Sequence, residues 1–128
     1  MIEKQYRFCY TVGMKHEELS AKLDSLKNLG GHHRFYEILM QMAELHARKN
    51  SNYAEDGNPL SNLKECEKFG VPAYIGTMVR MSDKWSRLQQ LTKGKTDAVG
   101  ENIKDTLLDM AVYSILEYIL IEEFEKKT

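Results

Sequence analysis

The chain has 128 residues, with 18 Lys plus Arg against 19 Asp plus Glu, which leaves a formal charge of −1. This length fits one domain that can bury a core without disulfide or metal support. The composition, 42% hydrophobic and 29% charged with only 2 Pro and 8 Gly, excludes disordered, collagen-like and low-complexity chains. The near-neutral charge argues against a broad nucleic-acid-binding surface, which normally carries a basic excess.

Cysteine usage and hydropathy indicate a cytoplasmic protein. Cys9 and Cys66 form neither a disulfide framework nor a metal-ligand spacing, so we expect a reducing compartment. The first residues lack the apolar stretch of a secretory signal. The longest apolar run, residues 106–121, contains Asp109 and Glu117 and is shorter than the ~20 residues that a membrane span needs. We therefore expect no membrane partner.

Residues 1–31 form a predicted N-terminal arm. Apolar and polar side chains alternate over residues 6–12, which predicts a short strand. Leucines then recur at every third or fourth position from 19 to 29, and Gly30-Gly31 ends this short amphipathic helix. We place a domain boundary at the double glycine, between the arm and a core of residues 32–128.

The core begins with a predicted helix over residues 33–49, which has a regular apolar stripe. Turn-forming residues dominate the next segment, 50–59. Asn58 and Pro59 at its end suit the start of a short helix that stops at Gly70.

Two long helices are predicted to complete the chain, over residues 73–92 and 97–126. Beyond Thr106 the second of these is apolar on nearly every side, which predicts a central position. The expected fold class is all-α, a four- or five-helix bundle. A homo-oligomer is also expected, because one neighbour cannot cover every apolar side of that helix and the N-terminal strand has no partner.

The predicted helix 73–92 carries one polar stripe. Its members are Arg80, Asp83, Lys84 and Arg87. At about 100° per residue they cover about 100° of the helix surface. One interpretation is a solvated face with internal ion pairs. The other is a phosphate-binding face, because three cations around one carboxylate suit a polyphosphate whose charge a metal bridges.

The last helix carries a column of carboxylates at i+4 spacing, Glu101, Asp105 and Asp109. Asp109 lies inside an apolar segment, where a carboxylate is costly unless it is paired or binds a cation. One interpretation is an ion pair from Asp109 to a cation of the polar stripe. The other is a Mg²⁺ or Mn²⁺ site made by the three carboxylates together with Asp83.

The turn-rich segment and the residue before it can recognise a base. The amide of Asn52 can read a base edge, the ring of Tyr53 can stack on it, and Lys49 can contact phosphate. An equally open interpretation is a polar surface turn with a packed tyrosine.

Four segments of the chain resemble the motifs of one family. They are Lys49 to Tyr53, Asn58 to Leu63, Val79 to Leu88 and Glu101 to Tyr113. Over about residues 35–122 the chain resembles the nucleotide-modification-associated domain, type one, found largely in bacteriophage proteins. The Arg-Met-x-Asp-Lys and Asp-Thr-x-x-Asp segments are the more specific parts. Where the family usually has Asp-Tyr-Gly, this chain has Asn52-Tyr53-Ala54.

The layout is also similar to that of all-α nucleoside triphosphate pyrophosphohydrolases of the MazG and dimeric dUTPase type. Those enzymes hold Mg²⁺ with Glu and Asp side chains of bundle helices and direct water at a phosphoanhydride. The resemblance implies a phage-type nucleotide-binding protein of the host cytoplasm that hydrolyses a nucleotide between its α- and β-phosphates.

The leading hypothesis is therefore a metal-dependent pyrophosphohydrolase. Its candidate catalytic residues are Asp83, Asp105 and Asp109, and its candidate metal ligands are these three residues together with Glu101. Its candidate phosphate ligands are Arg80, Lys84 and Arg87. Its candidate base-binding residues are Lys49, Asn52 and Tyr53. The cofactor would be Mg²⁺ or Mn²⁺, and a metal-bound water would be the nucleophile.

Two alternatives come from other classes of protein. One is a non-catalytic nucleotide binder, such as a sponge for a signalling nucleotide or an accessory subunit of a nucleotide-modification system. The excess of Arg and Lys over metal ligands on helix 73–92 favours it. The other is a structural oligomer assembled through the N-terminal arm.

Overall fold

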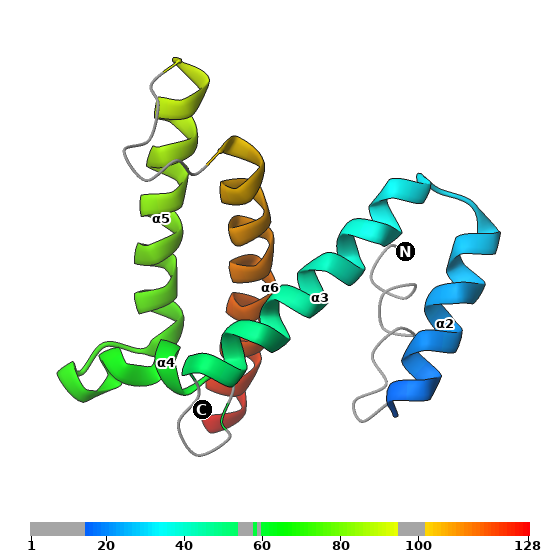
Figure 1. The fold of residues 1–128 in the computed structure, drawn as a ribbon. Coiled ribbons are helices and arrows are strands. Elements are labelled where there is room, and N and C mark those ends of the chain that lie inside the picture. The colour runs from blue at the N-terminus through cyan, green and yellow to red at the C-terminus, as the bar shows by residue number, and fades with distance from the viewer. Residues whose placement is uncertain (1–14, 54–57, 59, 95–101) are drawn as a thin grey trace, which may run out of the picture. The chain divides into compact units, whose positions relative to one another are not determined.

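The computed structural model describes residues 15–53, 58, 60–94 and 102–128 (Figure 1). All the regular secondary structure in these residues is helical, which confirms the all-α fold class. In chain order the elements are α2 (His16–Leu29), α3 (His33–Tyr53), α4 (Ser61–Lys64), the 3₁₀ helix η2 (Glu65–Phe69), α5 (Ala73–Thr92) and α6 (Ile103–Lys127). The predicted strand over 6–12 lies outside the described residues. Within the described ranges, none of the helices is both long and apolar enough to cross a membrane.

The chain divides into two compact units, residues 1–41 and 42–128, and the division falls inside α3. The described part of the first unit holds α2 and the first turns of α3. Gly30 and Gly31, both at positive φ, follow α2, which confirms the predicted helix end. The Tyr36 hydroxyl donates a hydrogen bond to the Gly30 carbonyl at 2.8 Å and fixes this turn. A domain boundary at residue 31 stays a prediction.

Two helix boundaries differ from those expected. Residues 50–53, predicted as part of a turn, continue α3, because weak helix formers are tolerated at the end of a long helix. α6 begins at Ile103 rather than near residue 97, because Asn102 caps it. The Asn102 side chain accepts the Asp105 amide at 2.9 Å, and the Asp105 carboxylate accepts the Asn102 amide at 3.4 Å. This reciprocal capping box fixes the start of the helix.

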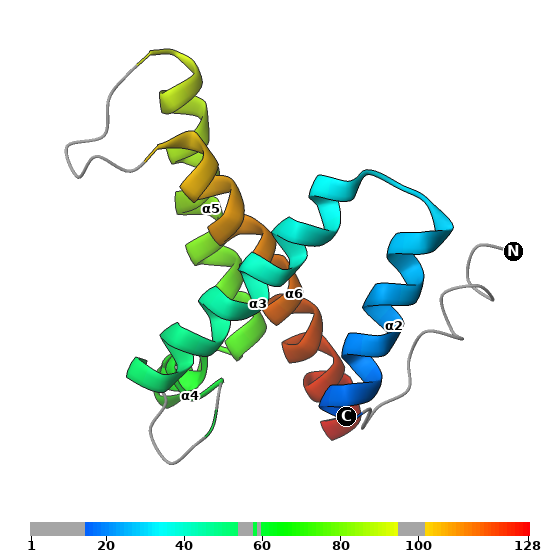
Figure 2. The same cartoon turned by 45° about the vertical axis from the view of Figure 1, so that its right-hand side comes forward.

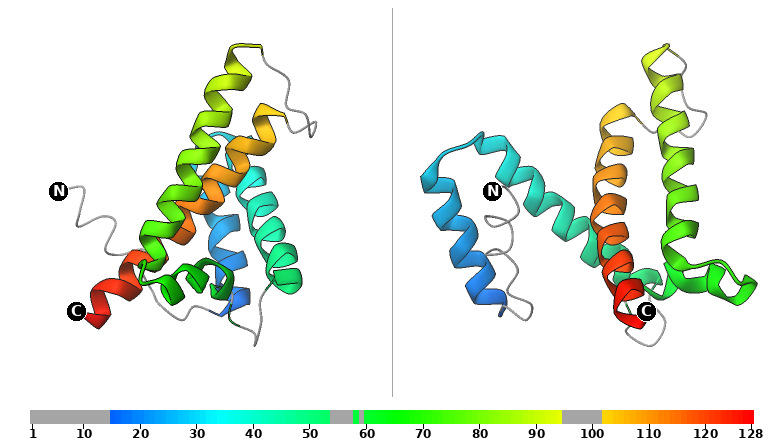
Figure 3. Two further views of the ribbon diagram at one scale, coloured as in Figure 1. Left: turned by 90° about the vertical axis from the view of Figure 1, so that its left-hand side faces the viewer. Right: turned by 180° about the vertical axis from the view of Figure 1, so that it is seen from behind.

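The core of the second unit forms where α5 and α6 lie side by side in antiparallel directions, with α4 and η2 against the start of α5 (Figures 1, 2 and 3). α5 spans the predicted residues 73–92. The buried cluster consists of Leu60, Leu63, Ala73 and Leu120, with Tyr74, Tyr113 and Leu116 packed against it. Removal of these side chains from water is the main stabilising term of the unit.

The short helical segment before α5 starts and stops near the predicted residues. The Asn58 side chain accepts the Leu60 amide at 3.0 Å just before α4. Gly70 ends η2 with φ +80°, a left-handed conformation that favours glycine. These two turns bring Leu60 and Leu63 onto the α5–α6 pair.

Glu117 is a carboxylate buried in this core. It is only 6% exposed, and neither of its carboxylate oxygens has a hydrogen-bond partner among the described residues. Thr77 of α5 is also buried, and its hydroxyl likewise lacks a partner there. Burial raises the pKa of Glu117 above the ordinary glutamate value. The charged form of Glu117 therefore destabilises the fold.

Substitution of Gly76 is expected to destabilise the second unit. A Cβ atom at this position in α5 would lie 2.5 Å from Cys66 Sγ of η2. Gly76→Ala should therefore lower the free energy of unfolding by about 1–2 kcal/mol, although Gly→Ala ordinarily stabilises a helix by about 1 kcal/mol. Urea denaturation measures the change. Adding Cys66→Ala should restore most of the loss, and a Gly76→Ala protein as stable as the parent would contradict the prediction.

Glu117→Leu is expected to stabilise the protein, because it removes a buried carboxylate that has no hydrogen-bond partner among the described residues. The free energy of unfolding should rise by about 1–3 kcal/mol at neutral pH. Because the pKa of Glu117 is raised in the folded state, parent stability falls as pH rises from the ordinary glutamate range through the folded pKa. The gain should therefore be smaller at about pH 5 than at neutral pH.

Denaturation curves of the parent and of Glu117→Leu at about pH 5 and at neutral pH measure this change in the free energy of unfolding. The control is Glu125→Leu, at an exposed position on the same helix, which should change stability by less than about 0.5 kcal/mol. A Glu117→Leu protein that is less stable than the parent at neutral pH would show that the carboxylate is compensated.

Candidate functional site

Three charged side chains from three helices meet in the second unit. Lys49 Nζ of α3 donates a hydrogen bond to Asp109 Oδ1 at 3.0 Å. Lys84 Nζ of α5 donates to Asp109 Oδ2 at 2.9 Å. Each oxygen of one α6 carboxylate is therefore held by a different lysine. We refer to Lys49, Lys84 and Asp109 as the lysine–aspartate cluster.

Helical periodicity places two members of the cluster where α5 and α6 meet. Lys84 follows the buried residue Thr77 by seven positions, and Asp109 precedes the buried residue Leu120 by eleven. Residues at these spacings share one helix face. The Lys84 and Asp109 side chains are accordingly only 21% and 16% exposed, whereas the Lys49 side chain is 52% exposed. The cluster is thus anchored in the helix interface and open at Lys49.

The two lysines keep Asp109 ionised. Burial opposes its ionisation, but the hydrogen bonds from Lys84 and then from Lys49 outweigh burial and hold its pKa below the ordinary aspartate value. An ion pair from Asp109 to the polar stripe was one of the two interpretations open from the sequence, and it is confirmed for Lys84. Lys49, expected beside a base, is the second partner of Asp109.

The other candidate phosphate ligands flank Lys84 on α5. Arg80 lies about one turn before it and Arg87 about one turn after, each within about 60° around the helix. Arg80 is exposed and Arg87 half-buried. The stretch of α5 from Arg80 to Arg87 therefore carries three cations and one carboxylate.

The described carboxylates do not gather as a metal-ligand set. Asp83 is exposed on α5, the Asp105 carboxylate belongs to the capping box, and Asp109 is held by two lysines. Within the described ranges, no group of three or more His, Cys, Asp or Glu side chains could hold a metal ion. Glu101 lies outside these ranges. A Mg²⁺ or Mn²⁺ site that includes it stays a prediction, and the described residues supply no catalytic step through a metal.

The candidate base-binding residues Asn52 and Tyr53 form the end of α3. Their side chains lie outside the described part of the structure. Their backbone follows Lys49 within about one helical turn. The base-binding role of both residues stays a prediction.

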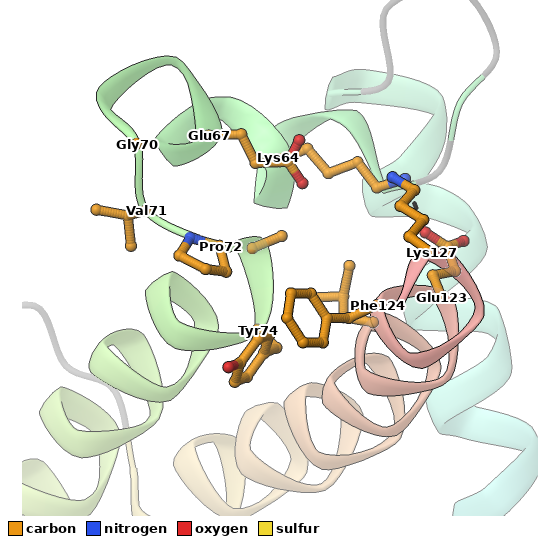
Figure 4. A pocket seen from close by; sticks show the side chains of 11 residues that line it. Lys64, Glu67, Gly70, Val71, Pro72, Tyr74, Glu123, Phe124 and Lys127 are labelled. Carbon is orange, nitrogen blue, oxygen red and sulfur yellow. Dashed lines mark ion pairs between the residues drawn. The ribbon is translucent and has the colours of Figure 1, made fainter.

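A separate cavity of about 320 Å³ lies where the start of α5 meets the end of α6 (Figure 4). Tyr74 and Phe124 line it with ring centroids 4.8 Å apart, and Lys64 forms an ion pair with Glu123 at 2.8 Å. None of the candidate site residues predicted from the sequence lines this cavity. Leu120, which lines the cavity, lies eleven residues beyond Asp109, about 16 Å along α6. The cavity is therefore distinct from the lysine–aspartate cluster.

Two features of the second unit were not found from the sequence. The contact between Lys49 and Asp109 joins residues 60 positions apart, and no local pattern signals it. Glu117 carried a usable signal, because it lies inside the same apolar stretch as Asp109. A carboxylate at position 117 needs a partner for the same physical reason, the cost of burying a charge.

Comparison with known proteins adds no relative. No protein-family model matches the chain, and no curated protein or solved structure is significantly similar to it. The resemblance to the nucleotide-modification-associated domain therefore rests on the four motif segments and stays a prediction.

Asp109→Asn is expected to destabilise the protein, because it removes the ion pair between this carboxylate and the partly buried Lys84. The free energy of unfolding should fall by about 1–2 kcal/mol at neutral pH. Because the pKa of Asp109 is lowered in the folded state, its stabilising effect is present above the ordinary aspartate pKa and lost as pH falls through the folded value. Acidification below about pH 4 should therefore reduce the difference in the free energy of unfolding between the parent and Asp109→Asn.

The matched control for Asp109 is Asp83→Asn, because Asp83 is exposed and has no partner among the described residues. Denaturation curves at neutral and acidic pH should show a change within about 0.5 kcal/mol for this control. Equal decreases in the free energy of unfolding of Asp109→Asn and Asp83→Asn would mean that the cluster contributes nothing specific to stability.

Proposed function

We propose that this protein binds a nucleotide through its phosphate groups at the lysine–aspartate cluster. The observation that carries the proposal is one carboxylate shared by lysines from two other helices. Each ammonium group has three N–H donors, and Asp109 accepts one from each. Asp109 thus positions Lys49 and Lys84 through one donor of each ammonium group.

The charge around the cluster favours an anionic ligand. Four cations, Lys49, Arg80, Lys84 and Arg87, stand against the described carboxylates of Asp83, Asp105 and Asp109. Ammonium and guanidinium groups form strong charge-assisted hydrogen bonds with phosphate oxygens. The cations from Arg80 to Arg87 span seven residues, about 10 Å along α5, which suits linked phosphate groups better than one isolated phosphate.

The nucleotide part of the proposal is supported by position and by resemblance. Asn52 and Tyr53 come three and four residues after Lys49 on α3, so a ligand held by Lys49 has an amide and an aromatic residue type close to it in the chain. The four motif segments that resemble the nucleotide-modification-associated domain include all of these positions.

The proposal is limited to binding. The pyrophosphohydrolase hypothesis requires carboxylates that gather around a metal, and the described ones have other partners or stand apart. A non-catalytic nucleotide binder is therefore the function that the described geometry supports best.

Titration calorimetry, in which individual nucleoside triphosphates are added to the protein, tests this function. Binding is expected without added metal and should weaken as salt concentration rises, because the contacts are ionic. Lys84→Gln should weaken binding by about tenfold or more, since it removes a charge-assisted contact. The control is Lys126→Gln, at an exposed position in the last turn of α6, which should leave affinity unchanged.

Three outcomes would contradict the proposed function. They are absence of binding to every nucleotide, loss of binding on addition of EDTA, and equal weakening by the two lysine substitutions. Release of pyrophosphate in the presence of Mg²⁺ would instead support the pyrophosphohydrolase hypothesis over a non-catalytic binder.

A further inference from the structure

From Ile103 to Ile121 of α6, one side of the α5–α6 pair carries no charged residue. Lys84 and Asp109 mark the line along which the two helices meet. Trp85 and Met110 each follow these residues by one position, about 100° further around their helices. Because the helices are antiparallel, this step turns both side chains toward the same side of the pair. Arg80 is displaced from Lys84 in the opposite rotational direction around α5, away from the side of Trp85.

Helical spacing extends this side as far as Ile121, and the next position at the same spacing is the exposed Glu125. The members of this side are Met78, Met81 and Trp85 of α5 and Ile103, Leu107, Met110, Ser114, Tyr118 and Ile121 of α6, which we call the uncharged face. The α6 members recur at intervals of three and four residues, the spacing of a helix-packing seam. α6 therefore has two apolar seams, one against α5 and one on the uncharged face.

The second seam is exposed in the single chain. Met78, Trp85, Ile103, Leu107 and Tyr118 are between 38% and 56% exposed. The sequence predicted a central position for α6, and the described residues of one chain leave this side of it open to solvent. Apolar patches of this kind on soluble proteins commonly mark interaction sites.

The exposed area is sufficient for a dimer. A bare side chain of this size presents about 200 Å², so five half-exposed ones present about 500 Å² per copy. Two copies would then bury about 1,000 Å² or more, the lower bound for a specific interface. A two-fold contact brings the same patch of both copies together. A face without charges meets its own copy with no like-charge repulsion, and two helix pairs together make a four-helix bundle.

We propose that the uncharged face binds a second copy of this chain, so that α5 and α6 of two protomers form a four-helix bundle. The inference is independent of nucleotide binding, because the lysine–aspartate cluster points away from this face. Trp85, the single tryptophan of the chain, lies on the face and reports its burial.

Sedimentation and tryptophan fluorescence over a range of protein concentrations test the dimer. The expected mass is twice the 14.9 kDa of one chain, with emission typical of a buried indole. On dilution the mass should fall to one chain while the emission shifts to longer wavelength in parallel. A one-chain mass at every concentration would overturn the proposal. So would buried-type emission at one-chain mass, which would mean that another segment of the same chain covers the face.

A matched pair of double variants locates the interface. Leu107→Glu with Tyr118→Glu places two charges on the uncharged face and keeps Trp85 as the probe; dimer affinity should weaken by about 100-fold or more. The control, Val79→Glu with Ile119→Glu, places two charges at exposed apolar positions on other sides of the same helices and should leave the dimer intact. Persistence of the dimer in the first variant, or its loss only in the control, would overturn the assignment.

Discussion

The antiparallel packing of α5 on α6 fixes where the polar groups of the second unit lie. Lys84 and Asp109 occupy facing positions in that interface, and Lys49 reaches the same carboxylate from α3. If the register of α5 against α6 shifted by one residue, each side chain would turn by about 100° and the ion pair would be lost. Both the cluster and the uncharged face therefore depend on this one helix–helix contact.

Two carboxylates on α6 show how the same interface gives opposite electrostatic results. Asp109 and Glu117 both lie in the packed part of the helix, where burial disfavours a charge. Two lysines compensate Asp109, and its pKa falls. Glu117 has no such partner among the described residues, and its pKa rises. Partners from neighbouring helices, not burial alone, decide the charge state in this core.

The second unit separates a charged region from an apolar one. Cations around the lysine–aspartate cluster suit phosphate groups, whereas the uncharged face, which includes Trp85 and Leu107, suits another apolar surface. This separation means that a nucleotide and a second protomer could occupy the unit at once.

The sequence by itself determined the all-α class, the extent of α5 and the stops at the double glycine and Gly70, because local periodicity and glycine conformation set these features. It also indicated that Asp109 needs a partner. Only the tertiary structure decided which partners it has, because Lys49 comes from a helix 60 residues away and its approach depends on how the helices pack. The same holds for the candidate metal ligands: their i+4 spacing is a property of the sequence, but Asp105 is used as a helix cap and Asp83 faces solvent.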